Sequence, residues 1–171
     1  HRSRPMLILT ASNGHNLRLA ELVAEHSIGQ GHRATLIDLV DLDLPLYTPI
    51  SEKTGSGERL SQLITALKRE GRLWICAPEY NGSTPPSLTN ALAWLSRSTQ
   101  DFRALFNGLP VALSSHSGGG GQKALIAMRV QFAHLGCHVL GRELLSSSHK
   151  PANPESIAAM VEELHRLPSA G

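Results

Sequence analysis

The sequence has few cysteines, few aromatic residues and no long apolar run, and each shortage excludes a class of protein. Two cysteines, Cys76 and Cys137, among 171 residues are too few for a disulfide framework, a four-thiolate metal site or an iron–sulfur cluster. Aromatic residues make up only 4% of the chain, which is little material for a base-stacking surface. No apolar run is long enough to span a membrane, and the run at residues 6–9 is too short for a signal peptide.

Charge is also scarce and evenly divided. Lys and Arg number 16 and Asp and Glu number 14, without a block of like charges, so neither a nucleic-acid arm nor a membrane arm is expected. Charged residues make up 18%, below the roughly 25% that is usual. We therefore expect surface covered by another copy of the chain, in a homodimer or homotetramer. The few cysteines and the lack of a signal-peptide pattern make a cytoplasmic location the expectation. Residues 1–5, which begin without Met, are expected to be flexible or a remnant of expression or trimming.

Apolar runs and helical periodicities alternate along the chain and predict one domain over residues 1–171. Buried strands are predicted at residues 6–11, 34–40, 72–77, 109–115 and 137–145. Amphipathic helices are predicted at 17–29, 57–70, 85–95, 122–135 and 154–167, with caps at Ser56, Thr84 and Asn153 and a stop at Gly71. Residues 41–55 read as a polar loop. This alternation predicts an α/β fold: a doubly wound, five-stranded parallel sheet of flavodoxin-like order 2-1-3-4-5 with helices on both faces.

Three unusual loops follow the first, third and fourth predicted strands, at residues 10–16, 77–85 and 114–121. These strands are neighbours in the expected order, so the loops should meet at the carboxyl edge, where ligands of such sheets bind. The first loop is small and polar and leads into a helix, which suits a phosphate or an ordinary N-cap turn equally. The chain contains neither G-x-G-x-x-G nor G-x-x-x-x-G-K-[ST], so a dinucleotide fingerprint and a nucleotide-hydrolysing loop are both absent.

The second loop carries a specific pattern. Pro78-Glu79-Tyr80-Asn81-Gly82-Ser83-Thr84-Pro85, followed by Leu88, Asn90-Ala91 and Trp94, resembles the signature of the NADPH-dependent FMN reductase family, Pro-Glu-Tyr-Asn-Gly-Ser-x-Pro-Gly-x-Leu-Lys-Asn-Ala-x-Asp-Trp. That family has a flavodoxin-like fold and includes quinone, azo-dye and chromate reductases. The resemblance covers nearly the whole chain in the order of its strands and helices.

The resemblance implies an FMN site made by the three loops. It assigns the flavin ring to Pro78, Glu79, Tyr80, Asn81 and Gly82 and to the second ring-binding loop, Ser115, His116, Ser117, Gly118 and Gly119. The phosphate falls to the loop of Ser12, Asn13, Gly14, His15 and Asn16. The flavin would carry the chemistry, with NADPH or NADH as donor and a quinone, flavin, azo compound or metal oxyanion as acceptor, in ping-pong order. No catalytic side chain and no metal are expected.

The departures from the family pattern concern the phosphate. The family loop runs Gly-Ser-x-Arg-x-x-Ser-x-Asn; here Ser12 and Asn16 fit its ends, but the loop is shorter and lacks the Arg. Its length is closer to that of flavodoxin loops. The missing Arg leaves the preference between NADH and NADPH open. Pro86, Thr89 and Ala93 stand where the family has Gly, Lys and Asp.

Two alternative functions remain possible from the sequence, and the roles of several histidines are undecided. A flavodoxin-type electron carrier would bind FMN without taking hydride, although such carriers are usually acidic. A non-catalytic relative would keep only the fold. His116 is expected either to contact ring or substrate or to be an ordinary loop histidine, and His15 either to donate to the phosphate or to face solvent. His134 and His138 beside Cys137 are more typical of surface histidines than of a zinc site.

Overall fold

The computed structural model describes residues 4–170, whose strands form one parallel sheet. The strand order is β2-β1-β3-β4-β5, and a sixth strand, β6, also bonds to β4. This order confirms the expected flavodoxin-like topology. The strands are β1 (Met6–Thr10), β2 (Ala34–Asp38), β3 (Leu73–Cys76), β4 (Pro110–His116), β5 (His138–Val139) and β6 (Leu144–Ser146).

Seven helices connect and cover the strands of the described chain. They are α1 (His15–Gly29), α2 (Leu39–Leu42), α3 (Pro49–Thr54), α4 (Glu58–Glu70), α5 (Pro86–Arg97), α6 (Gln122–His134) and α7 (Pro154–Arg166). Asn153 caps the start of α7, as the sequence predicted. Gly71 ends α4, also as predicted, and has a left-handed φ of 65°. None of the helices within residues 4–170 has the length and apolarity needed to cross a bilayer.

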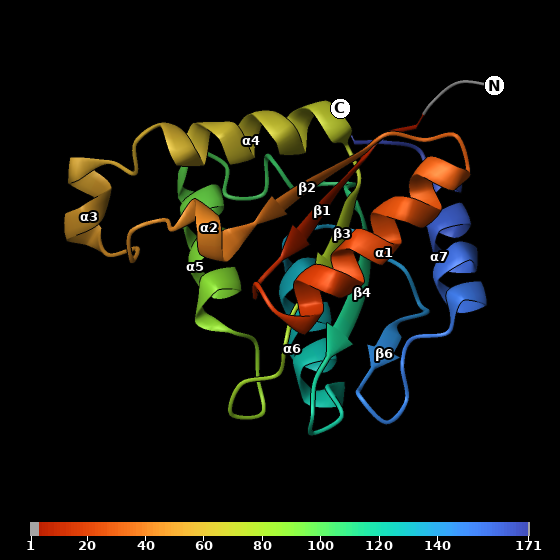
Figure 1. Cartoon of the computed structure of the whole chain (residues 1–171). Coiled ribbons are helices and arrows are strands. Elements are labelled where there is room, and N and C mark those ends of the chain that lie inside the picture. Colours follow the sequence, from red (N-terminus) through yellow and green to blue (C-terminus); the bar gives the residue numbers. More distant parts are fainter. Residues whose placement is uncertain (1–3, 171) are drawn as a thin grey trace.

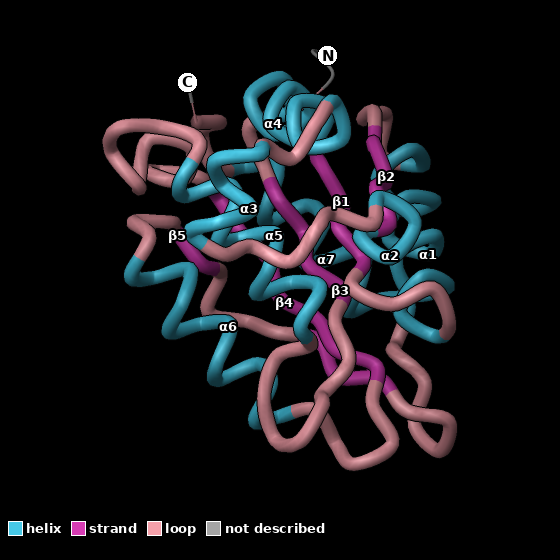
Figure 2. The backbone as a smooth tube through the Cα atoms, turned by 90° about the vertical axis from the view of Figure 1, so that its left-hand side faces the viewer, coloured by secondary structure: helices cyan, strands magenta, loops and turns pink. Residues whose placement is uncertain are grey.

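Alternate residues of each central strand enter two separate cores, one on each face of the sheet. Leu7 and Leu9 of β1 pack with α4, α5 and α6, whereas Met6 and Ile8 pack with α1 and α7. Both faces are covered, which is why these strands read as unbroken apolar runs. The two helix layers flank the strands in Figure 1, and the loops at the carboxyl ends of the strands gather at the bottom of Figures 1 and 2.

The strand predicted at residues 137–145 is present but interrupted, because two short strands, β5 and β6, lie in its place. Val111 of β4 is paired with Val139, and Ser114 of β4 is paired with Leu144. From the first pair to the second, β4 is three residues further along, whereas the outer segment is five residues further along. The extra residues leave the ladder around Gly141, which is exposed. The chain then returns to pair with the carboxyl end of β4.

The beginning of α5 also differs, by one residue. The sequence predicted Thr84 as the cap and Pro85 as the first helical residue, but Pro85 is the cap and Pro86 begins the helix. Because a residue before proline is disfavoured in the helical region, Pro85 stays extended, with φ −74° and ψ 152°. The second proline therefore occupies the first helical position.

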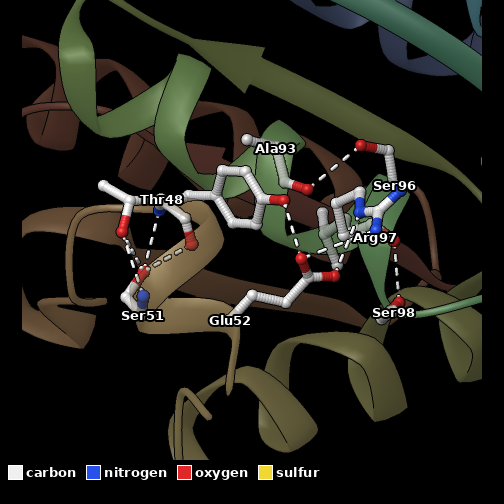
Figure 3. A network of polar contacts seen from close by, with 9 residues as sticks. Thr48, Ser51, Glu52, Ala93, Ser96, Arg97 and Ser98 are labelled. Atoms are coloured by element: carbon white, nitrogen blue, oxygen red, sulfur yellow. Dashed lines mark hydrogen bonds and ion pairs between the residues drawn. The ribbon is translucent and has the colours of Figure 1, made fainter. Parts of the chain in front are cut away.

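Residues 41–55 do not form the expected loop, since two short helices lie within residues 39–54. Thr48 and Ser51 form a reciprocal capping box that begins α3, with Pro49 at its first position. Glu52 then accepts hydrogen bonds from the Tyr47 hydroxyl at 3.1 Å and from Arg97 of α5 at 3.0 Å (Figure 3). These contacts fasten the segment to α5.

A buried histidine lies at the opposite end of the sheet from the loops. His165 of α7 is 3% exposed, its ring lies 4.0 Å from that of His32, and its Nε2 is 3.1 Å from the Ser27 hydroxyl. Burial, and then the charges of His32, Arg72 and Arg4, lower the pKa of His165 to about 3. The fold therefore keeps this ring neutral.

We expect His165 to make stability depend on pH. The unfolded chain protonates this ring near pH 6.5 and the folded chain does not, so its contribution is complete above pH 6.5 and is lost as the pH falls towards 3. At pH 5 the loss is up to about 2 kcal/mol. Urea unfolding at pH 7.5 and pH 5 measures it. The His165→Gln variant should show a smaller difference between the two pH values, whereas exposed His149→Gln should match the wild type; equal pH dependence in all three would contradict the assignment.

Candidate functional site: three loops at the carboxyl edge

The loop after β1 opens α1 without a side-chain cap. Helix α1 begins at His15, and its cap, Gly14, has no side chain to accept from the first turn. The Thr10 hydroxyl donates to the carbonyl of Ser12 at 2.7 Å and shapes the turn. Within the described chain, the backbone N–H groups of residues 12–15 donate to no protein acceptor. These open donors and the positive end of the helix dipole favour an anion here.

Asn16 joins this loop to the end of β4. Its side-chain oxygen accepts from the backbone N–H of His116 at 2.9 Å, and its amide nitrogen donates to the His116 carbonyl at 2.9 Å. The residue is 2% exposed. Both ends of the amide are therefore used inside the protein, and Asn16 positions the first and third loops relative to each other.

The loop after β3 is a two-residue hairpin turn. Tyr80 and Ser83 exchange backbone hydrogen bonds of 3.0 Å across Asn81 and Gly82. Asn81 and Gly82 both have positive φ, 51° and 72°, which is the backbone of a type I′ turn and explains the Asn-Gly pair. The turn leaves Tyr80 47% exposed beside the site.

Glu79 connects this loop to the glycine-rich loop. Its Oε1 accepts from the backbone N–H of Ala124 at 3.1 Å, in the first turn of α6. That helix begins after Gly121 and has no capping side chain of its own. The Glu79 carboxylate thus caps α6 from a different loop and interacts favourably with the helix dipole. Pro78, just before it, is buried at the end of the strand.

The glycine-rich loop lies over Ser115. The hydroxyl of Ser115 is buried and has no hydrogen-bond partner among residues 4–170. A Cβ on Gly121, which has φ +84°, would lie 2.8 Å from this oxygen, so the backbone approaches too closely for another residue. Further along, Ser117 donates its backbone N–H to the Ser146 carbonyl at 3.1 Å, while Gly118 has open space where a side chain would be.

His15 and His116 stack on each other between the first and third loops. Their ring centroids are 4.5 Å apart and the planes differ by 16°. His116 Nδ1 is 2.9 Å from the Ser146 hydroxyl. Burial, followed by the charge of His15, lowers the pKa of His116. Neither ring is an isolated surface histidine, and the sequence alone did not predict that they pair.

Two further residues of the site escaped the sequence prediction. Ser87, in the first turn of α5, donates its hydroxyl to the carbonyl of Ala11 at 2.9 Å and so joins the first loop to the helix after the second. Ser146 of β6 holds both the ring of His116 and the backbone of Ser117. A serine carries no local signal for such long-range contacts, and nothing in the sequence could have singled these two out.

Known proteins resemble this chain over most of its length. Residues 5–151 match the sequence model of the NADPH-dependent FMN reductase family. The chain is 27% identical over 168 residues to a Mycoplasma pneumoniae protein described as uncharacterized protein MG342 homolog, covering 95% of this chain and 98% of that protein.

Solved structures show the same fold. The flavoenzyme NAD(P)H:(acceptor) oxidoreductase FerB from Paracoccus denitrificans superposes with a TM-score of 0.77 at 17% identity, over 96% of both chains. The NADH:FMN oxidoreductase EmoB superposes with a TM-score of 0.73 at 13% identity, over 99% of this chain and 92% of that one. At these identities the likeness concerns the fold.

We expect Asn16→Ala to destabilise the protein. The substitution leaves the part-buried N–H and carbonyl of His116 without their partners, which costs about 1–3 kcal/mol of unfolding free energy. Asn13→Ala is the matched control, since Asn13 is exposed in the same loop and should change stability by less than about 0.5 kcal/mol. Denaturant unfolding of both variants measures the difference. Equal stability of the two would show that the Asn16 bridge does not hold the loops.

Proposed function

The chain belongs to the NADPH-dependent FMN reductase family, and we propose that it passes electrons from NADH or NADPH through bound FMN to a small acceptor. The family uses FMN with NAD(P)H as electron donor. We propose a ping-pong order in which donor and acceptor use one exposed ring face in turn. A quinone, a free flavin, an azo compound and a metal oxyanion are the acceptor classes that suit such an open face.

The residues at the carboxyl edge fit FMN in their donor chemistry. The open backbone N–H groups of residues 12–15 suit the phosphate. The hairpin turn of Asn81 and Gly82 and the open space at Gly118 allow a flat ring to approach the backbone closely. We assign the ring to the loops after β3 and β4 and the phosphate to the loop after β1.

The chain contributes binding and orientation to this reaction. Bound FMN supplies the hydride and electron chemistry. Backbone N–H groups of the glycine-rich loop would donate to the bound ring and so favour negative charge on it. Tyr80, which is half-exposed next to the turn, limits the open face at which donor and acceptor bind. No side chain has to act as a nucleophile and no metal is needed.

The observation that carries this proposal is the set of contacts between the loops. Asn16 joins the first loop to the third, Glu79 joins the second to the third, and Ser87 joins the first to the helix after the second. Each contact joins two of the segments that follow the carboxyl ends of β1, β3 and β4. Such preorganisation is what a cofactor held by backbone groups requires.

We expect purified protein mixed with FMN to keep a yellow flavin band after the excess is removed, and NADH or NADPH to bleach that band. The visible absorption spectrum measures both steps. A retained band that neither nucleotide bleaches would indicate an electron carrier of the flavodoxin type. A protein that stays colourless would contradict the proposal and leave a relative that shares only the fold.

We also propose that α6 forms the contact between two copies of the chain. Ile126 and Val130 lie one helical turn apart and are 62% and 65% exposed, while the opposite side of the same helix enters the core. We place these two exposed apolar side chains at the centre of the proposed interface. The low charge content of the chain agrees with a homodimer, or with a homotetramer built from it.

The double variant Ile126→Lys, Val130→Lys should be a monomer, because it would bury charge in the proposed interface. Light scattering at micromolar concentration measures the mass of the variant and of the wild type. Ile28→Lys on α1 is the matched control, since Ile28 is also 62% exposed, and it should keep the wild-type mass. A monomeric wild type would rule out this interface.

A further inference from the structure

Among residues 4–170, the permanent cations near the first and third loops are paired with a carboxylate, lie beside the second loop or are exposed. Arg18, one turn into α1, forms an ion pair with Glu21 at 3.1 Å and its side chain is 64% exposed. Lys123 of α6 lies beside Gly82, at the ring end of the site. Lys150 and His149 are exposed in the segment between β6 and α7. The groups that meet between the first and third loops are instead two imidazoles, His15 and His116.

The His116 ring is held in a defined orientation. Its backbone is clamped by Asn16, and its Nδ1 is 2.9 Å from the Ser146 hydroxyl. That hydroxyl oxygen also accepts from the Ala152 backbone N–H at 3.3 Å, so its own hydrogen can be donated to Nδ1. When Ser146 donates in this way, the proton of the neutral ring lies on Nε2. Nε2 has no protein partner among the residues described, which leaves it able to donate to a ligand.

The stacked geometry makes positive charge on both rings at once unfavourable. Two positively charged rings 4.5 Å apart repel each other, and this repulsion is the second cause, after burial, of the lowered pKa of His116. Without a ligand, burial and His15 keep the pKa of His116 low. A phosphate dianion beside the pair reverses this balance, because an opposite charge favours the protonated form.

We propose that the stacked His15–His116 pair recognises the phosphomonoester of FMN and takes up a proton when it binds. This rests on the proposed function, since it concerns the same flavin site. The backbone donors of residues 12–15 and the start of α1 supply neutral hydrogen bonds to the phosphate, and the pair supplies the charge. In this proposal the histidine pair takes the place of the Arg that the family carries in its first loop. Unlike the charge of Arg, the charge of the pair depends on pH.

Comparing FMN with riboflavin isolates the phosphate, because the two differ only in that group. We expect the ratio of riboflavin Kd to FMN Kd to rise up to about tenfold between pH 8.5 and pH 7, as the pair becomes able to accept a proton. The phosphate itself loses its second proton at about pH 6, so this range keeps it mostly a dianion. Quenching of flavin fluorescence on titration with protein measures both constants.

Calorimetry gives a second readout that does not depend on turnover. Titration of FMN into the protein at pH 7.5, in two buffers that differ in ionisation enthalpy, should show uptake of about 0.5–1 proton more than titration of riboflavin. The double variant His15→Gln, His116→Asn should abolish the extra uptake and flatten the pH dependence of the Kd ratio, and each single variant should reduce both. His15 is exposed, so its variant tests the pair without disturbing the core, and the asparagine at position 116 can still reach Ser146.

Two control variants separate the pair from other cations. Arg18→Gln removes a permanent charge on the same helix, and His26→Gln removes a histidine at its far end; both should keep the proton uptake. The proposal is overturned if FMN binds with the wild-type pH dependence in His15→Gln and His116→Asn, or if only Arg18→Gln lowers the preference for FMN. If the wild type binds neither FMN nor riboflavin, the proposed function fails together with this proposal. If the wild type binds FMN but the variants keep its pH dependence, only the proposal about the histidine pair fails.

Discussion

Two hydrogen bonds between the buried amide of Asn16 and the backbone of His116 hold the functional edge of this protein together. They fix the first turn of α1 against the end of β4, although the two residues lie 100 positions apart in the sequence. The His15 ring reaches His116 because of that connection, and the turn after β1 remains open because Asn16 is used elsewhere. Glu79 likewise joins two segments, because its carboxylate caps α6 from the loop after β3. The edge is therefore held by polar side chains inside the protein, and its backbone donors are left for a ligand.

Most of the fold could be predicted because its signals are local. Asn153 with Pro154 begins α7, and Gly71 ends α4, since caps and left-handed turns depend on a few neighbouring residues. Helix α3 has an equally local signal in Thr48, Pro49 and Ser51. It was predicted as loop because none of its residues is buried, so it lacks an apolar period. The break between β5 and β6 has a weaker local signal, the single Gly141 inside an apolar run. That glycine is compatible with a bulge but does not indicate that the chain returns to pair with β4.

The site was predictable in its place but not in its contacts. Parallel strands end at one edge, so the strand order alone brings the three loops together. The assignment of single residues to ring and phosphate stays a prediction. The roles of Ser87 and Ser146 depend on partners far away in the sequence, and periodicity carries no information about them. The pairing of His15 with His116 is of the same kind, because it requires the register of β4 and the start of α1 to be known together.

The interruption around Gly141 also affects how copies of this chain can associate. A continuous outer strand would offer a row of unpaired N–H and C=O groups onto which another chain could add a strand. Here that side of the sheet ends in strands of two and three residues that bond to different parts of β4. Neither piece is long enough to template a stable strand addition. Copies of the chain can therefore associate at this side only through complementary side chains, which select a specific partner. Extension of the sheet from copy to copy into a fibre is disfavoured.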